Sequence, residues 1–219
     1  MPFSPYRILF EDDHLLIVDK LSKELVVRGK GKMRKLPLLD LLKEDYPGLR
    51  AVHRLDFETS GALVFAKSKE ALDAILKSDF AGWKKIYTTL VMGRLSKDLG
   101  VISKKLSARM KGTLVPATTH YRVLERFGNS SLIEAKIETG RHHQIRRHFA
   151  AIHHPLVCDD EYGHRKFNNV FTQEFGYRTF FLHASMIEFP HPITGEKVHI
   201  ESPLPKTFAG IVKKLKSLN

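Results

Sequence analysis

The part of this chain best equipped for chemistry is the segment His53–Gly61, where Asp56 follows Arg54 by two residues. An ionised carboxylate can act as a nucleophile or remove a proton, and a guanidinium can pair with anions or stack on a flat ring. The segment ends in Ser60 and Gly61, a pair typical of turns. We therefore expect a catalytic loop around Asp56, held in place by a rigid scaffold.

Hydrophobic periodicity and turn residues predict the elements of that scaffold. We expect strands at residues 7–10, 15–19, 62–66, 85–92, 118–126, 131–138, 179–189 and 197–200. We expect helices at residues 38–45, 69–80, 141–152 and 205–218. The stretch from Arg94 to Pro116 has weak periodicity and many Lys, Ser and Gly residues, which indicates a long loop or insertion and a candidate nucleic-acid contact region. These elements predict a single α+β domain over residues 1–219, with a mixed, mainly antiparallel sheet and flanking helices.

The helix expected at residues 141–152 is amphipathic. Its apolar face has spacing i, i+4 and i+7, with Ile145, Phe149 and Ile152. Its polar face is expected to carry Arg141, Gln144, Arg147 and His148. Backbone N–H groups at the start of a helix can bind phosphate. We therefore expect nucleic-acid contacts from the first residues of this segment, Arg141, His143 and Gln144.

The charge of the chain favours a polyanionic partner, because 36 Lys and Arg residues outnumber 24 Asp and Glu residues. The basic runs lie at residues 28–35, 104–111, 141–147 and 213–216. One such run is often only a solvated surface, but four runs together favour RNA or DNA. A membrane fits less well, since no apolar stretch approaches the roughly 18 residues needed to cross a bilayer.

The chain also predicts its compartment and the absence of cofactors. Cys158 is the single cysteine, so neither an internal disulfide nor a zinc-finger spacing exists, and no signal-peptide core precedes the first strand. We expect a cytoplasmic protein. The clustered histidines His142, His143, His148, His153 and His154 lack the spacing of metal ligands on one helical face. No Gly-rich phosphate loop is present, so we expect neither a metal nor a nucleotide cofactor.

Several stretches of the sequence resemble the motifs of the RluA-type pseudouridine synthases, enzymes that isomerise selected uridines in RNA. The longest is HRLDFETSGALVFAKS at residues 53–68. The others follow in the family's order, at Lys85–Tyr87, Thr139–Arg146, His154–Pro155, Asp159, Tyr162–Gly163 and Leu182–Ala184. The resemblance implies the same fold, and it implies that the catalytic carboxylate is the aspartate of HRLD, Asp56.

The resemblance also implies roles for four other residues. Arg146 stands where the family places the cation that keeps the catalytic carboxylate ionised. Tyr87 matches the active-site tyrosine, which would stack on a uracil flipped out of the RNA. Arg54 resembles the residue that relatives push into the vacated place of the base, and Leu182 is expected to form an apolar wall of the uracil pocket. Without the resemblance, an Asp–Arg pair or a strand tyrosine is more often structural.

One segment departs from the family pattern. The usual Lys-Pro-x-Gly element after the second strand is Lys20-Leu21-Ser22-Lys23-Glu24 here, without proline or glycine. We expect this loop to have a different shape. Many relatives also carry a small RNA-binding domain of the S4 type before the catalytic one, whereas only a few residues precede the first expected strand in this sequence.

These observations predict a pseudouridine synthase that acts on ribosomal or transfer RNA, as a monomer with no implied protein partner. Asp56 could attack the base ring, attack the sugar or remove a sugar proton, and the sequence leaves the three routes open. One alternative is a catalytically inactive RNA-binding or assembly protein that kept the fold. Another is a nucleic-acid glycosidase, in which Asp56 assists cleavage and the base leaves. Only isomerisation leaves the mass of the RNA unchanged.

Overall fold

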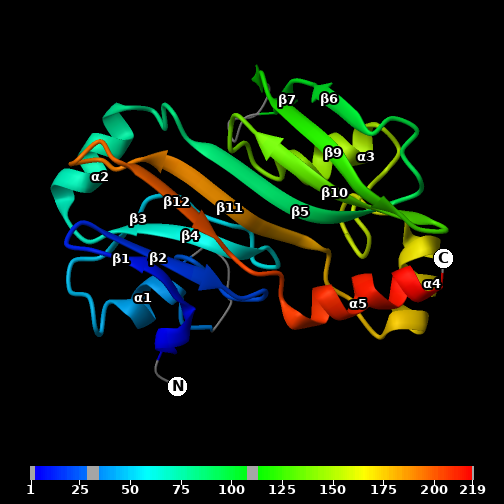
Figure 1. Cartoon of the computed structure of the whole chain (residues 1–219), viewed down its shortest axis with the longest axis horizontal. Helices are drawn as coiled ribbons and strands as arrows, with labels where there is room; N and C mark the ends of the chain where they lie inside the picture. Colours follow the sequence, from blue (N-terminus) through cyan, green and yellow to red (C-terminus); the bar gives the residue numbers. More distant parts are fainter. Residues whose placement is uncertain (1–2, 29–34, 108–112, 219) are drawn as a thin grey trace. The chain divides into compact units, whose positions relative to one another are not determined.

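The computed structural model of the protein describes residues 3–28, 35–107 and 113–218 (Figure 1). The chain divides into two compact units. Unit 1 comprises Met1–Lys84 and Ala184–Pro203, and unit 2 comprises Lys85–His183 and Leu204–Asn219. Each unit is therefore built from two stretches of chain that are distant in sequence. The expectation of a single catalytic domain over residues 1–219 is not decided by this division and stays a prediction.

Unit 1 is a sheet in which β1, β2, β4 and β11 are successive neighbours, with β3 paired to β4 and β12 paired to β11. The strands are β1 (Ile8–Glu11), β2 (Leu15–Lys20), β3 (Arg50–Ala51), β4 (Ser60–Ala66), β11 (Leu182–Pro190), which begins in unit 2, and β12 (Lys197–Glu201). The helices are the short η1 (Pro5–Arg7), α1 (Leu38–Leu42) and α2 (Lys69–Lys77). Strands β2 and β4 are antiparallel, with Lys20 opposite Gly61, so the end of β2 adjoins the start of β4.

The core of unit 1 forms around β4, which is buried at all of its residues. A continuous apolar run is typical of a strand covered on both faces. Helix α2 packs on this core through Ala71 and Ile75. Its N-terminus is capped by Ser68, whose side chain accepts a hydrogen bond from the backbone N–H of Ala71. The strand that follows the predicted catalytic loop is thus the most deeply buried strand of the unit.

Unit 2 contains an antiparallel sheet in the order β5-β10-β9-β6, and a separate short pair, β7 and β8. The strands are β5 (Lys84–Met92), β6 (Leu99–Ser103), β7 (Leu106–Ser107), β8 (Leu114–Val115), β9 (Thr118–Arg126) and β10 (Ser130–Ile137). The helices are α3 (Gln144–Ala151), α4 (Arg165–Phe175) and α5 (Lys206–Ser217). The predicted α+β class, with a mixed and mainly antiparallel sheet, is confirmed.

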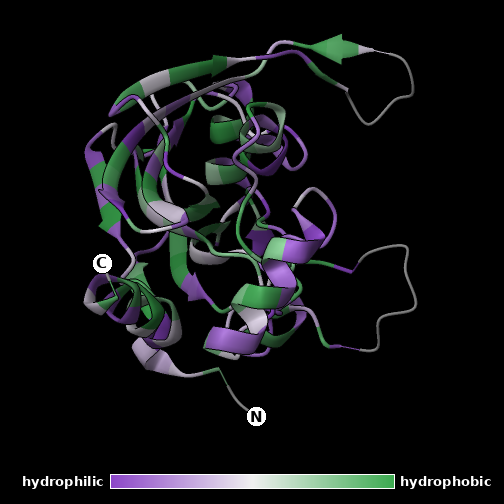
Figure 2. Cartoon of the chain, turned by 90° about the vertical axis from the view of Figure 1, so that its right-hand side faces the viewer, coloured by the Kyte–Doolittle hydropathy of each residue, from purple (hydrophilic) through white to green (hydrophobic). Residues whose placement is uncertain are grey.

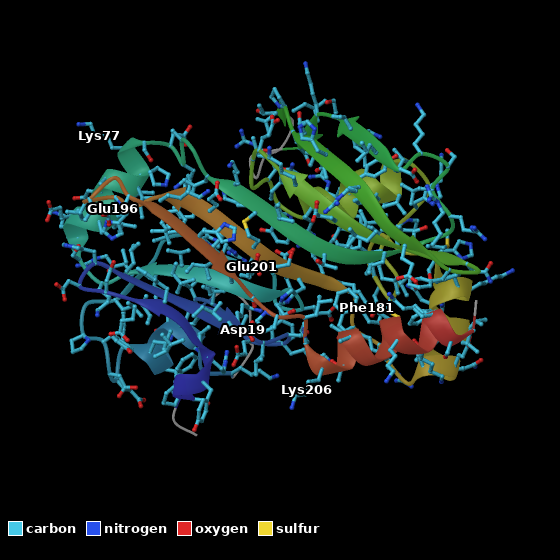
Figure 3. The ribbon with its side chains drawn as sticks, viewed as in Figure 1. Asp19, Lys77, Phe181, Glu196, Glu201 and Lys206 are labelled. Atoms are coloured by element: carbon cyan, nitrogen blue, oxygen red, sulfur yellow. The ribbon has the colours of Figure 1, made fainter. Side chains whose placement is uncertain are left out.

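The core of unit 2 is aromatic. Phe181, labelled in Figure 3, packs against Phe171 and Phe208, with ring centroids 5.7 and 4.9 Å away. Helix α5 buries Phe208, Val212 and Leu215 and exposes its lysines, so both hydrophobic and hydrophilic residues line its ribbon in Figure 2. Helix α5 therefore joins unit 2 through an apolar face, as expected for an amphipathic helix.

One sequence prediction of an element was wrong, and one helix was missed. The stretch 94–116 was expected to be a loop, but it holds β6, β7 and β8. Strand β6 lies at the end of the sheet order and leaves Leu99 and Val101 66% and 58% exposed, so pairing with β9 rather than burial of a hydrophobic face defines it. Helix α4 was not predicted at all. The spacing of Phe167, Phe171 and Phe175, followed by Gly176 as C-cap, was the signal that could have shown it.

Helix boundaries also differ from the expected ones, and local backbone geometry explains two of them. Helix α3 begins at Gln144 rather than at residue 141, because His143 has a left-handed backbone with a φ of 52°. Helix α2 ends at Lys77 rather than at residue 80, and Asp79 and Phe80 both have positive φ. None of the helices among the described residues is long and apolar enough to cross a bilayer.

A substitution at Gly61 tests the close packing of β4 on β11. Gly61 has a φ of 110°, and a Cβ there would overlap the backbone of Ala184. We expect Gly61→Ala to lower the free energy of unfolding by roughly 3 kcal/mol or more, through strain and overlap together. Gly176→Ala is the matched control, because Gly176 also has positive φ (68°) but has no atom near the added Cβ. It should cost only about 1–2 kcal/mol. Equal losses in urea denaturation would contradict the packing explanation.

Candidate active site

The predicted catalytic loop immediately precedes β4 and is fixed at both of its ends. Before Asp56, the ring of His53 accepts a hydrogen bond from the backbone N–H of Val64 at 3.3 Å, and the side chain of Leu55 is buried. After Asp56, the backbone N–H of Thr59 donates to the Asp56 carbonyl oxygen at 3.1 Å. Asp56 is half-buried and Arg54 is exposed. The loop thus presents Asp56 and Arg54 from a backbone anchored in unit 1.

A buried lysine holds this loop from the side of β2. Lys20 has no exposed surface, and its ammonium donates to the carbonyl oxygens of Leu21 (3.1 Å), Phe57 (3.1 Å) and Thr59 (2.5 Å). Two of these carbonyls belong to the loop, one on either side of Glu58. Lys20 therefore ties the loop to the end of β2. We expected this segment only to depart from the family pattern, and its contact with the loop was missed.

Burial lowers the pKa of Lys20 to about 8, although the carboxylates of Glu24 and Asp56 act in the opposite direction. The loss of hydration disfavours the charged form of an amine, and three carbonyl dipoles offset part of that loss. Because the charge of Asp56 acts on Lys20, the candidate catalytic carboxylate and the buried ammonium belong to one electrostatic environment. The lysine was not expected to be part of the site.

The segment after Lys20 keeps a tight turn without glycine. Lys23 has a φ of 67°, a left-handed conformation that glycine adopts more easily than other residues. The backbone N–H of Lys23 donates to the Phe57 carbonyl oxygen at 2.7 Å, which adds another link to the loop. The carboxylate of Glu24 pairs with Arg7 and accepts from the backbone N–H of Leu21. These hydrogen bonds stabilise the turn where the family pattern has proline and glycine.

Unit 2 holds the other predicted site residues. Arg146 on α3 is buried, and its guanidinium pairs bidentately with Asp159: Nε to Oδ2 is 2.6 Å and Nη2 to Oδ1 is 2.9 Å. Nη2 also lies 3.2 Å from the carboxylate of Glu161. The sequence predicted Asp56 as the partner of Arg146 and gave Asp159 no role. The Asp159 pair is thus an addition to the expected site, and pairing with Asp56 stays a prediction.

Tyr87 and Leu182 lie in strands. Tyr87 is on β5, opposite Ala135 of β10, and is 8% exposed. Leu182 begins β11 and is also buried. Burial of this kind agrees equally with a core residue and with the wall of a pocket, so the predicted roles of both residues stay predictions.

A small polar cluster lies at the turn just before α3. The His143 ring stacks on His142, with centroids 3.7 Å apart, and its Nδ1 lies 3.2 Å from the Tyr162 hydroxyl and 3.3 Å from the Glu161 carboxylate. Burial raises the pKa of Tyr162 to about 12, and the neighbouring Glu161 adds to the effect. Arg141 is exposed. Exposed Arg141 and His142 leave this turn able to meet an anion.

Gln144 and His148 were expected on the exposed polar face of this helix, and that prediction was wrong. Both are buried. The Gln144 amide donates to the Thr118 carbonyl oxygen (2.9 Å), and its oxygen accepts from the Thr139 hydroxyl (2.7 Å). The His148 ring bridges the Thr119 hydroxyl and the Lys104 carbonyl oxygen. These polar groups are satisfied inside unit 2, so Gln144 has almost no surface left for the RNA contact predicted for it.

Two further observations bear on what the site can bind. Among the described residues, no group of three His, Cys, Asp or Glu side chains is arranged to hold a metal ion. Of the predicted basic segments, residues 29–34 and 108–112 lie outside the described residues. The geometry of unit 1 therefore offers acid–base chemistry from Asp56, with Lys20 supporting its loop. The geometry of unit 2 offers the ion pairs of Arg146.

Comparisons with known proteins agree on one family. Residues 14–151 match the family model described as RNA pseudouridylate synthase. The chain is 38% identical over 207 residues to ribosomal large subunit pseudouridine synthase C of Vibrio cholerae, covering 90% of this chain. It is 39% identical over 230 residues to ribosomal large subunit pseudouridine synthase D of Nitrosomonas europaea, covering 98% of this chain. The chain spans 65% and 66% of the lengths of these two relatives.

A solved structure shares the fold. Human RNA pseudouridylate synthase domain containing 4 superimposes with a TM-score of 0.78, over 96% of this chain and 93% of that one. The two sequences are 24% identical. At this level of identity, the match concerns the fold alone.

The buried charge of Lys20 makes a prediction about pH. The folded-state pKa of about 8 lies below the ordinary value of 10.5, so between these values the unfolded chain binds more protons and folding becomes more favourable as pH rises. Relative to Lys20→Met, the wild type should gain roughly 2 kcal/mol of unfolding free energy between pH 7.5 and 9.5. Urea denaturation at the two pH values measures this gain. Relative to Lys77→Met, which keeps Lys20 and changes an exposed lysine of α2, the wild type should show no such gain. An equal gain in unfolding free energy relative to Lys20→Met and relative to Lys77→Met would contradict a lowered pKa of Lys20.

Proposed function

Because this chain belongs to the RNA pseudouridylate synthase family, and within it to the RluA type, we propose that it converts uridine to pseudouridine in ribosomal RNA. The observation that carries the proposal is the anchored loop before β4, which presents Asp56 half-buried beside an exposed Arg54. The printed names of the relatives support ribosomal RNA as the substrate. Transfer RNA is the second substrate class to test.

The reaction breaks the bond between the sugar and a ring nitrogen of uracil and forms a bond between the same sugar carbon and a ring carbon. The ring carbon loses a proton and the nitrogen gains one, so no atom is added to the RNA or removed from it. Asp56 starts this exchange. All three routes open to it, attack on the base, attack on the sugar and removal of a sugar proton, require the ionised carboxylate.

The remaining roles follow the family's motifs. Arg146 keeps the Asp56 carboxylate ionised, because a nearby guanidinium favours the charged form. Tyr87 stacks on the flipped uracil, and stacking of this kind is worth roughly 1–3 kcal/mol per base. Arg54 fills the place that the base vacates, and Leu182 lines the pocket. Lys20 joins this set through its contacts with the carbonyls of Phe57 and Thr59, which support the loop on either side of Glu58.

The protein binds RNA through its basic surface. Arg141 and His143, just before α3, and the exposed lysines near β6 supply positive charge for phosphate contacts. We place the enzyme in the cytoplasm, as a monomer that needs no cofactor. Its activity is then independent of any added metal or nucleotide.

Replacing Asp56 by asparagine tests the catalytic role. Asp56→Asn keeps the shape and removes the charge, so we expect the rate of pseudouridine formation to fall roughly 10³-fold or more. Unmodified ribosomal and transfer RNA are incubated with each protein, and pseudouridine is mapped by carbodiimide-dependent stops of reverse transcription. Asp13→Asn, at an exposed aspartate of unit 1, should retain wild-type activity.

The pattern of stops separates the possible functions. New stops with the wild type and the Asp13→Asn variant alone would establish the activity and the role of Asp56. Tight RNA binding without stops on either RNA class would instead favour an inactive RNA-binding protein. Loss of uracil from the RNA, detected as a decrease in mass, would indicate a glycosidase.

Charge reversal near β6 tests the RNA-binding surface. Lys104 and Lys105 are exposed and follow β6. We expect Lys104→Glu combined with Lys105→Glu to weaken RNA binding about tenfold or more, and to reduce the slope of log K against log salt by roughly 2. The matched control is Lys69→Glu combined with Lys77→Glu on α2, which changes the net charge equally. Affinity measured by filter binding over a salt series should change less in the control. Equal losses would mean that net charge alone determines binding.

A further inference from the structure

We propose that Asp159 is the positioning residue of Arg146, and that it sets the orientation in which this arginine serves catalysis. The inference rests on the proposed function. Neither the motif that contains Asp159 nor the sequence around it assigned this aspartate a role. Its contacts with Arg146 and with the backbone of Glu161 and Tyr162 give it one.

The contact between the two side chains fixes an angle as well as a distance. Asp159 uses both oxygens, at 2.6 and 2.9 Å, to bind Nε and Nη2 of Arg146. Two parallel hydrogen bonds between a carboxylate and a guanidinium make their planes coincide, which a single contact does not do. The plane of the arginine is therefore set by the plane of Asp159.

Asp159 is itself held rigidly. Its Oδ1 accepts from the backbone N–H groups of Glu161 and Tyr162, both at 3.0 Å, and its carbonyl oxygen accepts from the Asn168 amide and the Gly163 N–H, also at 3.0 Å. A Cβ at Gly163 would overlap that carbonyl oxygen, so the turn requires glycine. The carboxylate is thus attached to a closed turn of backbone hydrogen bonds rather than to a mobile segment.

Two aromatic rings pack against the guanidinium. The central carbon of Arg146 lies 4.9 Å from the centroid of the Tyr162 ring and 4.5 Å from that of Phe180. Contacts of this kind are worth about 2 kcal/mol when the cation is desolvated. They oppose rotation of the arginine about its Asp159 edge.

Burial separates Asp159 from the other carboxylate that touches Arg146. The side chain of Asp159 is 0% exposed and that of Arg146 is 7% exposed, whereas that of Glu161 is 53% exposed. Exposed ion pairs contribute little, while removing one partner of a buried pair leaves the other charge without compensation. Asp159 therefore determines the position of Arg146, and Glu161 contributes far less.

The same contacts show which nitrogens of Arg146 the two carboxylates bind. The contacts with Asp159 and Glu161 use Nε and Nη2. Nη1 takes part in none of these three contacts. Lysine cannot reproduce this division, because an ammonium lacks two separate edges. A positioning role of this kind affects the turnover of bound RNA more than the binding of RNA.

The test compares Asp159→Asn with Glu161→Gln, which make the same chemical change to the two partners of one arginine. On a ribosomal RNA fragment that the wild type modifies, we expect Asp159→Asn to lower kcat about 30-fold with KM within threefold. Glu161→Gln should lower kcat less than threefold. Both variants are checked for a cooperative thermal unfolding transition before the kinetics. Equal effects of the two, or a change confined to KM, would overturn the proposal.

Two additions keep the result decisive if Asp159→Asn folds poorly. Phe180→Leu removes a ring that faces the guanidinium, and Phe171→Leu is its control, at a phenylalanine buried to a similar degree in the same unit. Phe180→Leu should lower kcat at least threefold more than Phe171→Leu. In an Arg146→Lys background, Asp159→Asn should add less than threefold, since its effect passes through the arginine. Additive losses would show a general structural role instead.

The outcome also separates this inference from the proposed function. If the wild type produces no pseudouridine, the proposed function fails and the kinetics cannot begin. If the wild type is active and Asp159→Asn turns over RNA as fast as the wild type does, the function stands and the positioning role of Asp159 is wrong.

Discussion

A buried cation must be compensated by acceptors close to it, and this constraint acts in each of the two units. In unit 1, the ammonium of Lys20 has exchanged water for three backbone carbonyls, two of them in the loop that carries Asp56. In unit 2, the guanidinium of Arg146 has exchanged water for the carboxylate of Asp159. Since an uncompensated buried charge costs several kcal/mol, neither loop can move without disturbing its cation. The loop around Asp56 and the turn at Asp159 are thus held in place because each compensates a cation that has lost its water.

Regular secondary structure supplies the frame on which these cations act. The register of β2 against β4 places Lys20 beside the start of β4, and the turn after α3 brings Asp159 back to the helix that carries Arg146. In each unit a short segment with functional side chains is connected to a strand or helix with a large buried surface. This arrangement lets the loop have an irregular backbone, because the core residues of β4 and α3 provide the stabilisation.

The sequence predicted elements well where burial produced a pattern and poorly where backbone pairing or buried polar groups decided the structure. The apolar run of β4 and the motif around Asp56 can be identified from the sequence alone. The family roles of Asp56, Tyr87 and Arg146 remain predictions. Strand β6 was missed because it buries only Ile102 and leaves Leu99 and Val101 exposed. Gln144 and His148 were expected in solvent because polarity was taken as exposure, whereas each has partners inside unit 2. The role of Lys20 was also missed, because its acceptors are backbone carbonyls and a sequence pattern does not show them.

The division of unit 1 into two stretches has a consequence for synthesis on the ribosome. The loop with Asp56 and strand β4 emerge early, but Ala184, whose backbone closely faces Gly61, is translated long afterwards, with the first stretch of unit 2 in between. Contacts between residues so far apart in sequence form slowly. Until β11 is translated, β4 lacks this partner strand, and an apolar strand with an unpaired edge favours aggregation.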